Sequence, residues 1–202
     1  MAFEHYIYAD GKQLRCGYTT GTCAALAASG AVQRLLTGVW PETVSLRTPK
    51  GLTVEVPLEH CRMQGDTAQC SVRKDGGDDV DKTTGALIQA NVSLSDTPGV
   101  RIRGGQGVGR VTKPGLDQPV GEAAINRVPR QMIREAVEAA CRTADYDGGA
   151  EVTISVPEGE AIAQKTFNPQ MGIVGGISIL GTSGIVEPMS MQAMIDTMAL
   201  EL

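Results

Sequence analysis

The sequence predicts an α+β fold, with short, mainly antiparallel strands in mixed sheets packed against two long helices. Two helical patterns are clear, one beginning near residue 20 and one covering residues 129–141. Elsewhere, alternating apolar and polar residues around turn residues give hairpin signals that outnumber strand–helix–strand alternations. Aromatic residues make up only 3% of the 202 residues, so the core must be built from Ala, Val, Ile, Leu and Met.

The first helix follows a turn-rich segment. Residues 1–15 are expected to form an extended arm, and residues 17–25 then read Gly-Tyr-Thr-Thr-Gly-Thr-Cys-Ala-Ala. Thr20 or Thr22 is suited to cap the helix by accepting a hydrogen bond from a backbone N–H, and Gly38 fits its end. Free N–H groups and the positive end of the helix dipole would suit a carboxylate or phosphate. The alternative is that the segment only caps a helix.

Strands are expected in the next part of the chain. Residues 43–48 and 52–56 alternate apolar and polar side chains around a Pro-Lys-Gly turn, which is typical of a hairpin with one buried face. Residues 59–63 and 68–72 have the composition of two further short strands. These segments account for much of the antiparallel part of the predicted fold.

A loop rich in aspartate follows these strands. Asp75, Asp78, Asp79 and Asp81 lie within seven residues, which is too many for a simple turn. Three roles compete: binding a cation, acting as a general base or hydrogen-bond acceptor for a ligand, and ordering the loop itself through Asx turns. The spacing does not match an EF-hand loop, which argues against metal binding.

The second half of the chain contains a glycine-rich segment and the second helix. Residues 104–112 superficially resemble a dinucleotide-binding fingerprint, but they lead toward Pro114 and not into a helix, so we interpret them as a strand turn. Pro129 suits the first turn of the second helix. Residues 172–188 form an apolar run that ends in a loop of small hydroxylated residues, and Ser190 is expected to cap a final helix.

Composition and charge argue against several classes of function. The formal net charge of -5 and the pI of about 5.1 give no reason to expect nucleic acid or an acidic membrane as partner. No apolar run could span a bilayer and no signal-peptide pattern is present, so a cytoplasmic location is expected. The five cysteines are scattered, which supports neither disulfides nor zinc, and no protein-bound metal is expected. Cys23 is either reactive, with a lowered pKa at a helix start, or a buried filler.

Several segments together carry a resemblance that no shorter motif carries alone. Residues 14–25, 74–81 and 175–190 form the pattern, and residues 107–116 add to it. Together they resemble the CbiD family of cobalt-precorrin-5B C-1 methyltransferases. The resemblance implies S-adenosylmethionine as methyl donor and a cobalt-containing corrinoid intermediate as acceptor. A homo-oligomer is compatible with it.

The resemblance also bears on domain organisation, because members of this family usually continue into a second domain of substantial size. Residues 1–188 are therefore expected to form an N-terminal domain. Residues 189–202 are expected to form a helix from which a longer chain would continue into that second domain.

Methyl transfer to a corrinoid depends on positioning more than on acid–base chemistry. Asp75 and Asp79 are the candidates for taking up the proton displaced by methylation, with ordering of the loop as the alternative. Helix N-termini, hydroxyl-rich loops and arginines such as Arg101, Arg103 and Arg110 are suited to hold the carboxylates of the corrinoid. The residues expected to bind the substrate are Thr19, Thr20, Gly21, Thr22, Cys23, Asp78, Asp81, Arg110, Gly181, Thr182, Ser183, Gly184 and Glu187.

Three loops carry most of these residues: the capping loop (residues 19–23), the aspartate loop (residues 75–81) and the terminal loop (residues 181–187). We expect them to line one cleft, because polar loops gathered at one edge of a scaffold commonly build binding surfaces. Two other functions remain as alternatives. One is a corrinoid-binding domain that is not catalytic without a missing C-terminal domain. The other is a hydrolase with a threonine or cysteine nucleophile, which lacks a well-placed histidine base.

Overall fold

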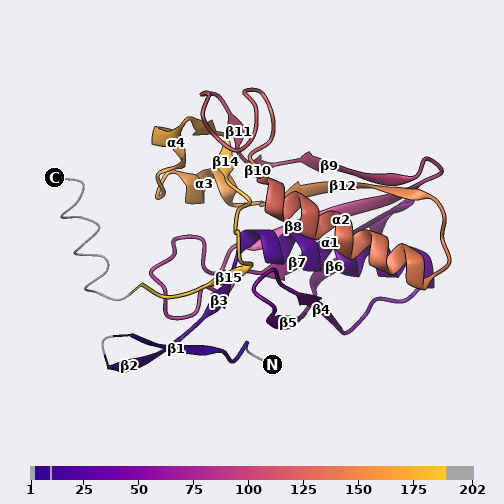
Figure 1. The fold of residues 1–202 in the computed structure, drawn as a ribbon. Coiled ribbons are helices and arrows are strands. Elements are labelled where there is room, and N and C mark those ends of the chain that lie inside the picture. Colours follow the sequence, from indigo (N-terminus) through magenta and orange to yellow (C-terminus); the bar gives the residue numbers. More distant parts are fainter. Residues whose placement is uncertain (1–2, 10, 190–202) are drawn as a thin grey trace.

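A five-stranded sheet forms one wall of the domain (Figure 1). The computed structural model describes residues 3–9 and 11–189. The strand order is β6-β7-β8-β12-β9, and neighbours are antiparallel except β12 and β9, which are parallel. Residues Ile88, Ala90 and Val92 alternate as buried positions along β8, the pattern of a strand with one face in the core. The bounds are β6 Glu59–Gln64, β7 Thr67–Arg73, β8 Leu87–Ser95, β9 Gly99–Gly104 and β12 Gly149–Ser155.

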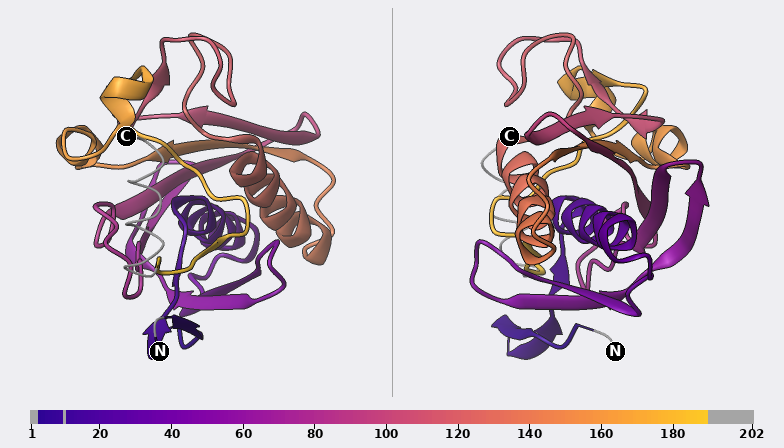
Figure 2. Two further views of the ribbon diagram at one scale, coloured as in Figure 1. Left: turned by 60° about the vertical axis from the view of Figure 1, so that its left-hand side comes forward. Right: turned by 90° about the vertical axis from the view of Figure 1, so that its right-hand side faces the viewer.

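The helix α1 (Thr20–Thr37) lies at the centre of the core. It contacts β7 and β8 of the sheet, the second long helix α2 (Arg127–Thr143) and, on another side, β4. Figure 2 shows it enclosed between these elements. Every residue from Thr20 to Val32 is buried, so the apolar face expected from the sequence extends around the whole first half of the helix.

Short strand pairs close the remaining sides of the domain. β4 (Thr43–Arg47) and β5 (Thr53–Pro57) form the predicted antiparallel hairpin, which lies below α1 in Figure 2. β3 (Gly17–Tyr18) pairs antiparallel with β15 (Ile185–Val186) directly before α1. An early strand, β3, and a late strand, β15, therefore meet next to the start of α1.

A glycine-packed lobe lies at the top of Figure 1. In it β10 pairs parallel with β14, and β11 pairs antiparallel with β13. A Cβ on Gly176 would lie 2.0 Å from the carbonyl oxygen of Gly107, so these strands approach this closely only without side chains. The bounds are β10 Gly107–Val108, β11 Arg110–Val111, α3 Gly159–Ala163, α4 Asn168–Met171, β13 Ile173–Val174 and β14 Gly176–Ile177.

The predicted fold class is confirmed: α+β, with two long helices and mostly antiparallel pairing. Gly38 ends α1 with a φ of 77°, as expected for a left-handed C-terminal position. The residue that caps α1 is Thr19 and not Thr20 or Thr22, because the Thr19 side chain accepts the hydrogen bond from the Thr22 N–H.

The expected N-terminal arm folds back on itself. β1 (Tyr6–Ala9) and β2 (Lys12–Arg15) form an antiparallel hairpin, and Gly11 supplies the positive φ, 71°, that the turn requires. Ser190 and the rest of the predicted final helix lie outside the described residues. Within those residues, none of the helices combines the length and the apolar character needed to cross a membrane.

Candidate functional site

The capping, aspartate and terminal loops meet at β3 (Figure 1). On one side, Tyr18 of β3 pairs with Ile185 of the terminal loop. On the other side, the Tyr18 N–H donates to the carbonyl oxygen of Asp75 at 2.9 Å. A Cβ on Gly17 would lie 2.3 Å from that oxygen, so glycine is required for the aspartate loop to approach. The structure thus joins all three loops through β3, and we call this arrangement the β3 junction. The expected single cleft is not what these residues form, because Thr182 and Asp75 line two different cavities.

The terminal loop closes the start of α1. The Gly21 N–H donates to the Leu180 carbonyl at 3.0 Å, and the Thr22 N–H donates to the Thr19 hydroxyl at 3.2 Å. The Thr22 hydroxyl donates in turn to the Gly184 carbonyl at 2.7 Å. The N–H groups of Gly21 and Thr22, which we expected to be free for a carboxylate or phosphate, are therefore taken by the protein itself.

Close packing reinforces this contact. The Thr20 hydroxyl accepts a hydrogen bond from the Leu180 N–H at 3.0 Å. A Cβ on Gly181, whose φ is 133°, would lie 2.3 Å from the Thr19 hydroxyl oxygen. A Cβ on Gly184 would lie 3.1 Å from the Thr22 hydroxyl oxygen. The two glycines therefore let the terminal loop lie directly on the capping loop.

Other side chains of the terminal loop are accessible. Thr182 and Glu187 are exposed, and the Glu187 carboxylate forms an ion pair with Lys50. The Ser183 hydroxyl donates to a backbone carbonyl of its own loop at 2.9 Å. Thr182 lines a cavity of about 360 Å³ together with Asn126 at the start of α2. This side of the loop is open to a ligand.

Three of the four aspartates hold the aspartate loop in place. Asp75 accepts two hydrogen bonds from the Arg15 guanidinium, at 2.6 and 2.9 Å. Asp78 accepts one from the Arg15 backbone N–H at 2.7 Å. Asp81 accepts one from the Lys74 ammonium at 2.7 Å. These bonds favour loop ordering, one of the roles that the sequence left open, for all three residues.

The electrostatics of the loop distinguish Asp79 from its neighbours. Hydrogen bonds from Arg15 lower the pKa of Asp75, and a carboxylate with a lowered pKa is a weak proton acceptor. Burial acts to raise the pKa of Asp81, but the hydrogen bond and the charge of Lys74 together with the hydrogen bonds from Thr83 outweigh it, so the pKa is lowered. The half-buried Asp79 carboxylate has no hydrogen-bond or ion-pair partner in the part of the chain that the structure describes.

Buried polar groups lie beneath the junction. The Lys74 side chain is only 1% exposed. Cys23 is fully buried and burial raises its pKa to about 12, so the hypothesis of a reactive thiol at this helix start is wrong. Burial also raises the pKa of Tyr18, whose hydroxyl donates to a backbone carbonyl at 2.9 Å. Sequence reasoning missed Lys74 and Arg15, although both lie inside the segments that carry the family resemblance.

The arginines considered from sequence are not at the junction. Arg110 lies on β11 in the glycine-packed lobe, where its guanidinium donates to the Gly121 carbonyl. β11 and β3 lie well apart, near the top and the bottom of the ribbon in Figure 1. Arg101 and Arg103 both pair with Glu151, at 3.1 and 3.2 Å. The structure therefore does not bring these side chains to the three loops.

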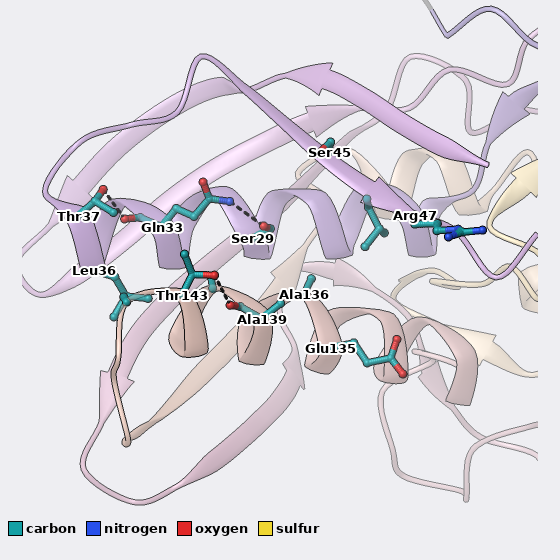
Figure 3. Close-up of a pocket in the computed structure, with 13 residues that line it drawn as sticks. Ser29, Gln33, Leu36, Thr37, Ser45, Arg47, Glu135, Ala136, Ala139 and Thr143 are labelled. Atoms are coloured by element: carbon teal, nitrogen blue, oxygen red, sulfur yellow. Dashed lines mark hydrogen bonds between the residues drawn. The ribbon is translucent and has the colours of Figure 1, made fainter. Parts of the chain in front are cut away.

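A groove that the sequence did not predict opens between α1, α2 and β4 (Figure 3). Its volume is about 550 Å³ and its walls are mostly apolar. Figure 3 shows Gln33 donating to the Ser29 hydroxyl at 3.0 Å, and the Thr143 hydroxyl donating to the Ala139 carbonyl at 3.0 Å. A signal that could have revealed the groove is the run of small side chains on α2, among them Ala136, Ala139 and Ala140, which leave space beside α1. The lining residues are Ser29, Gln33, Leu36, Thr37, Ser45, Leu46, Arg47, Glu135, Ala136, Ala139, Ala140, Thr143 and Ala144.

Comparison with known proteins assigns the chain to a family. The CbiD family model matches residues 7–188. The chain belongs to the CbiD family. The resemblance inferred from the separate segments is thereby confirmed. Within residues 3–9 and 11–189 of this CbiD-family chain, no three His, Cys, Asp or Glu side chains gather as a possible metal-binding set.

Relatives of known name are similar along almost all of this chain. The cobalt-precorrin-5B C(1)-methyltransferase of Geobacillus kaustophilus is 57% identical over 182 residues, which are 90% of this chain and 49% of that protein. The protein of the same name from Ruminiclostridium cellulolyticum is 50% identical over 199 residues, which are 98% of this chain and 52% of that protein. The chain thus spans about half the length of the curated relatives it matches.

The fold has also been observed in a crystal structure. The cobalamin biosynthesis protein CbiD from Archaeoglobus fulgidus superimposes with a TM-score of 0.70 at 37% sequence identity. The match covers 96% of this chain and 61% of that one. The arrangement of α1, α2 and the sheet is therefore shared with a solved member of the family.

Proposed function

We propose that this chain forms the N-terminal half of a cytoplasmic, S-adenosylmethionine-dependent methyltransferase that acts on C-1 of cobalt-precorrin-5B. The observation that carries the proposal is the 57% identity, over 182 residues, to a protein with that name. The convergence of the three loops at the β3 junction supports it, because residues far apart in the chain are held together there.

The reaction makes one bond and breaks one. The C-1 carbon of the corrinoid supplies an electron pair to the methyl carbon of S-adenosylmethionine, while the pair of the methyl–sulfur bond passes to sulfur and cancels its positive charge. Such a displacement needs an in-line approach, so a rigid surface that orients the corrinoid contributes more than a strong acid or base. The interlocked β3 junction fits this requirement.

Within this proposal the residues of the junction divide into two roles. Asp79 and Thr182 contact the substrate, because their side chains are accessible and Asp79 is uncommitted among the described contacts. A free carboxylate accepts a hydrogen bond or the displaced proton. Asp75 and its bonded neighbours hold the loop that presents Asp79. The other predicted binding residues of the three loops support these contacts.

The test is a methylation assay with both the purified chain and the full-length protein that contains it. Each is incubated with cobalt-precorrin-5B and S-adenosylmethionine, and mass spectrometry follows the corrinoid. The expected result is the gain of one methyl group, placed at C-1 by fragmentation or NMR. A full-length protein that binds the corrinoid but transfers no methyl group would contradict the proposal.

Calorimetry then separates the two ways in which this half could act. Titration of the isolated chain with S-adenosylmethionine and, separately, with the corrinoid gives the affinity for each. Tight binding of both ligands supports a chain that carries the complete site. Binding of the corrinoid alone would assign the methyl donor to the other half of the enzyme.

A further inference from the structure

Two cysteines face each other across the edge of the five-stranded sheet. β6 is an edge strand, because among the strands of the described residues it pairs with β7 alone in this sheet. The register of this pair shifts between Glu59 and Arg62, so His60 and Cys61 of β6 together oppose Cys70 of β7. His60 has a φ of 51°, which is rare for a residue other than glycine and marks the bulge. The bulge therefore places Cys61 beside Cys70 across the strand pair.

The two thiols have different surroundings. Cys61 is exposed and lines a cavity of about 350 Å³, whereas Cys70 is buried and its thiol donates to the Ala27 carbonyl of α1 at 3.1 Å. Burial raises the pKa of both thiols, and that of Cys70 more strongly, so Cys61 is the more readily ionised of the two. Opposed residues of antiparallel strands have Cα atoms about 4.5–5.5 Å apart, inside the range of roughly 4.4–6.8 Å that disulfides span.

We propose that Cys61 and Cys70 form a reversible disulfide by exchange with a small disulfide such as oxidised glutathione, which fastens β6 to β7. The Cys61 thiolate attacks one sulfur of oxidised glutathione, forming a mixed disulfide and releasing one glutathione thiolate. The Cys70 thiol, whose pKa is raised by burial, then gives up its proton as its sulfur attacks the Cys61 sulfur, and the second glutathione leaves; this is the slower of the two steps. The two protons lost by the protein end on the two glutathione molecules, so two thiols are oxidised as one disulfide is reduced.

The bond would act next to the β3 junction. Glu59 at the start of β6 pairs with Arg73 at the end of β7, with nitrogen and oxygen 2.5 Å apart. Both residues line a cavity of about 360 Å³ whose other walls include Tyr18 and Asp75. Edge strands open more readily than central ones, because one row of their backbone groups is unpaired. Fastening β6 therefore stabilises one wall of that cavity.

The first test is oxidation of the full chain by oxidised glutathione at about pH 8.5, near the pKa of a free thiol. Mass spectrometry of the intact protein and of its peptides identifies the product. The expected result is loss of two hydrogens and a peptide pair joined through Cys61 and Cys70. The variant Cys61→Ser should block the joined product, and Cys141→Ser, which removes a cysteine from α2, should not.

Two other products of the same reaction would overturn the proposal: a glutathione adduct that persists on Cys61, or a disulfide joining different cysteines. Complete resistance of the chain to oxidation would do the same. Cys70→Ala gives an independent check, since its Cys61 should stop at the mixed disulfide. The variant Cys61→Ser is the primary one because Cys61 is exposed and its change leaves the core intact.

Hydrogen exchange measures whether the disulfide holds β6 against β7. Amides of β6 should exchange about tenfold more slowly in the oxidised chain than in the reduced chain, and dithiothreitol should restore the faster rate. Amides of β4 and β5, which are not part of this sheet, serve as the internal reference. Equal rates for β6 in the two forms would show that the disulfide does not hold the strand.

Discussion

The β3 junction and the groove between α1 and α2 differ in how their polar groups are used. At the junction, Thr22 and Asp75 each bond to a residue of another segment and Lys74 bonds to Asp81 of its own, so little of this polar surface is left for a ligand. The groove, in contrast, leaves about 550 Å³ of volume open to a ligand, and its walls are mostly apolar. The comparison shows that the bonded residues of the junction build a rigid framework. Only the few that are uncommitted are free to meet a substrate.

The largest effect on stability is expected from the buried cation of the junction. Replacing Lys74 with Met leaves the Asp81 carboxylate without the ammonium that hydrogen-bonds it at 2.7 Å. Because the Lys74 side chain is only 1% exposed, the free energy of unfolding should fall by about 3 kcal/mol. Urea denaturation followed by circular dichroism measures this change.

Lys82→Met is the matched control for that variant, because Lys82 is an exposed lysine close by in the chain. Its free energy of unfolding should stay within about 0.5 kcal/mol of the unmodified chain. The double variant Lys74→Met with Asp81→Leu should recover part of the lost stability. Similar small effects for Lys74 and Lys82 would mean that the buried ion pair does not hold the aspartate loop.

A pair of alanine substitutions sharpens the contrast between core and groove. Ala28 lies on the buried part of α1, so Ala28→Leu should overpack the core and lower the free energy of unfolding by about 2 kcal/mol. Ala139 lies on α2 at the open groove, and Ala139→Leu should change it by less than about 0.5 kcal/mol. Thermal and urea unfolding of both variants measure the difference. Equal destabilisation would show that the groove is as tightly packed as the core.

The pH dependence of stability tests the link between Arg15 and Asp75. Their hydrogen bonds lower the pKa of Asp75 below that of an unfolded aspartate, which is about 3.9. The contribution is therefore present above the unfolded pKa and is lost as pH falls through the folded pKa. We expect the free energy of unfolding to decrease below about pH 4, and about 1 kcal/mol of this decrease to be absent in Arg15→Met.

The control for this titration is Arg134→Met, which removes an exposed arginine of α2. Its decrease in stability between neutral and acid pH should match that of the unmodified chain. An Arg15→Met variant with an unchanged acid slope would show that the pair does not contribute to folding. Urea unfolding at a series of pH values provides the measurement.

Some of this structure was readable from the sequence because the signals are local. Gly38 after the last turn of α1 and the alternation in β4 and β5 depend on neighbouring residues only. The bonds of the junction join distant residues: Arg15 and Asp75 are 60 positions apart, and Thr22 and Gly184 are 162 apart. No local pattern reveals such pairs, and so the role of Arg15 could not be predicted.

The same limit explains the errors at the start of α1. Several hydroxyl residues there are chemically suited to cap the helix, and the choice of Thr19 follows from how the terminal loop docks. That docking also occupies the Gly21 N–H, which the sequence suggested for an anion, and the Thr19 hydroxyl occupies the Thr22 N–H. The gathering of the three loops was predicted because each is a polar interruption of an apolar element, but their tight mutual bonding was not.

The smallest change in stability, and the most direct test of function, is expected for Asp79. Its carboxylate is half-buried and has no bonding partner among the described residues, so Asp79→Asn should alter the free energy of unfolding by less than about 0.5 kcal/mol. If the carboxylate takes up the displaced proton, turnover of the full-length enzyme should fall about a hundredfold while KM changes little.

Asparagine still accepts a hydrogen bond but not a proton, so comparison with Asp79→Ala separates the two roles. Asp66→Asn, an exposed aspartate in the turn between β6 and β7, should leave turnover unchanged. Normal methylation by both Asp79 variants would show that the aspartate loop only holds the structure together. The substrate contacts would then have to come from the open side of the terminal loop at Thr182.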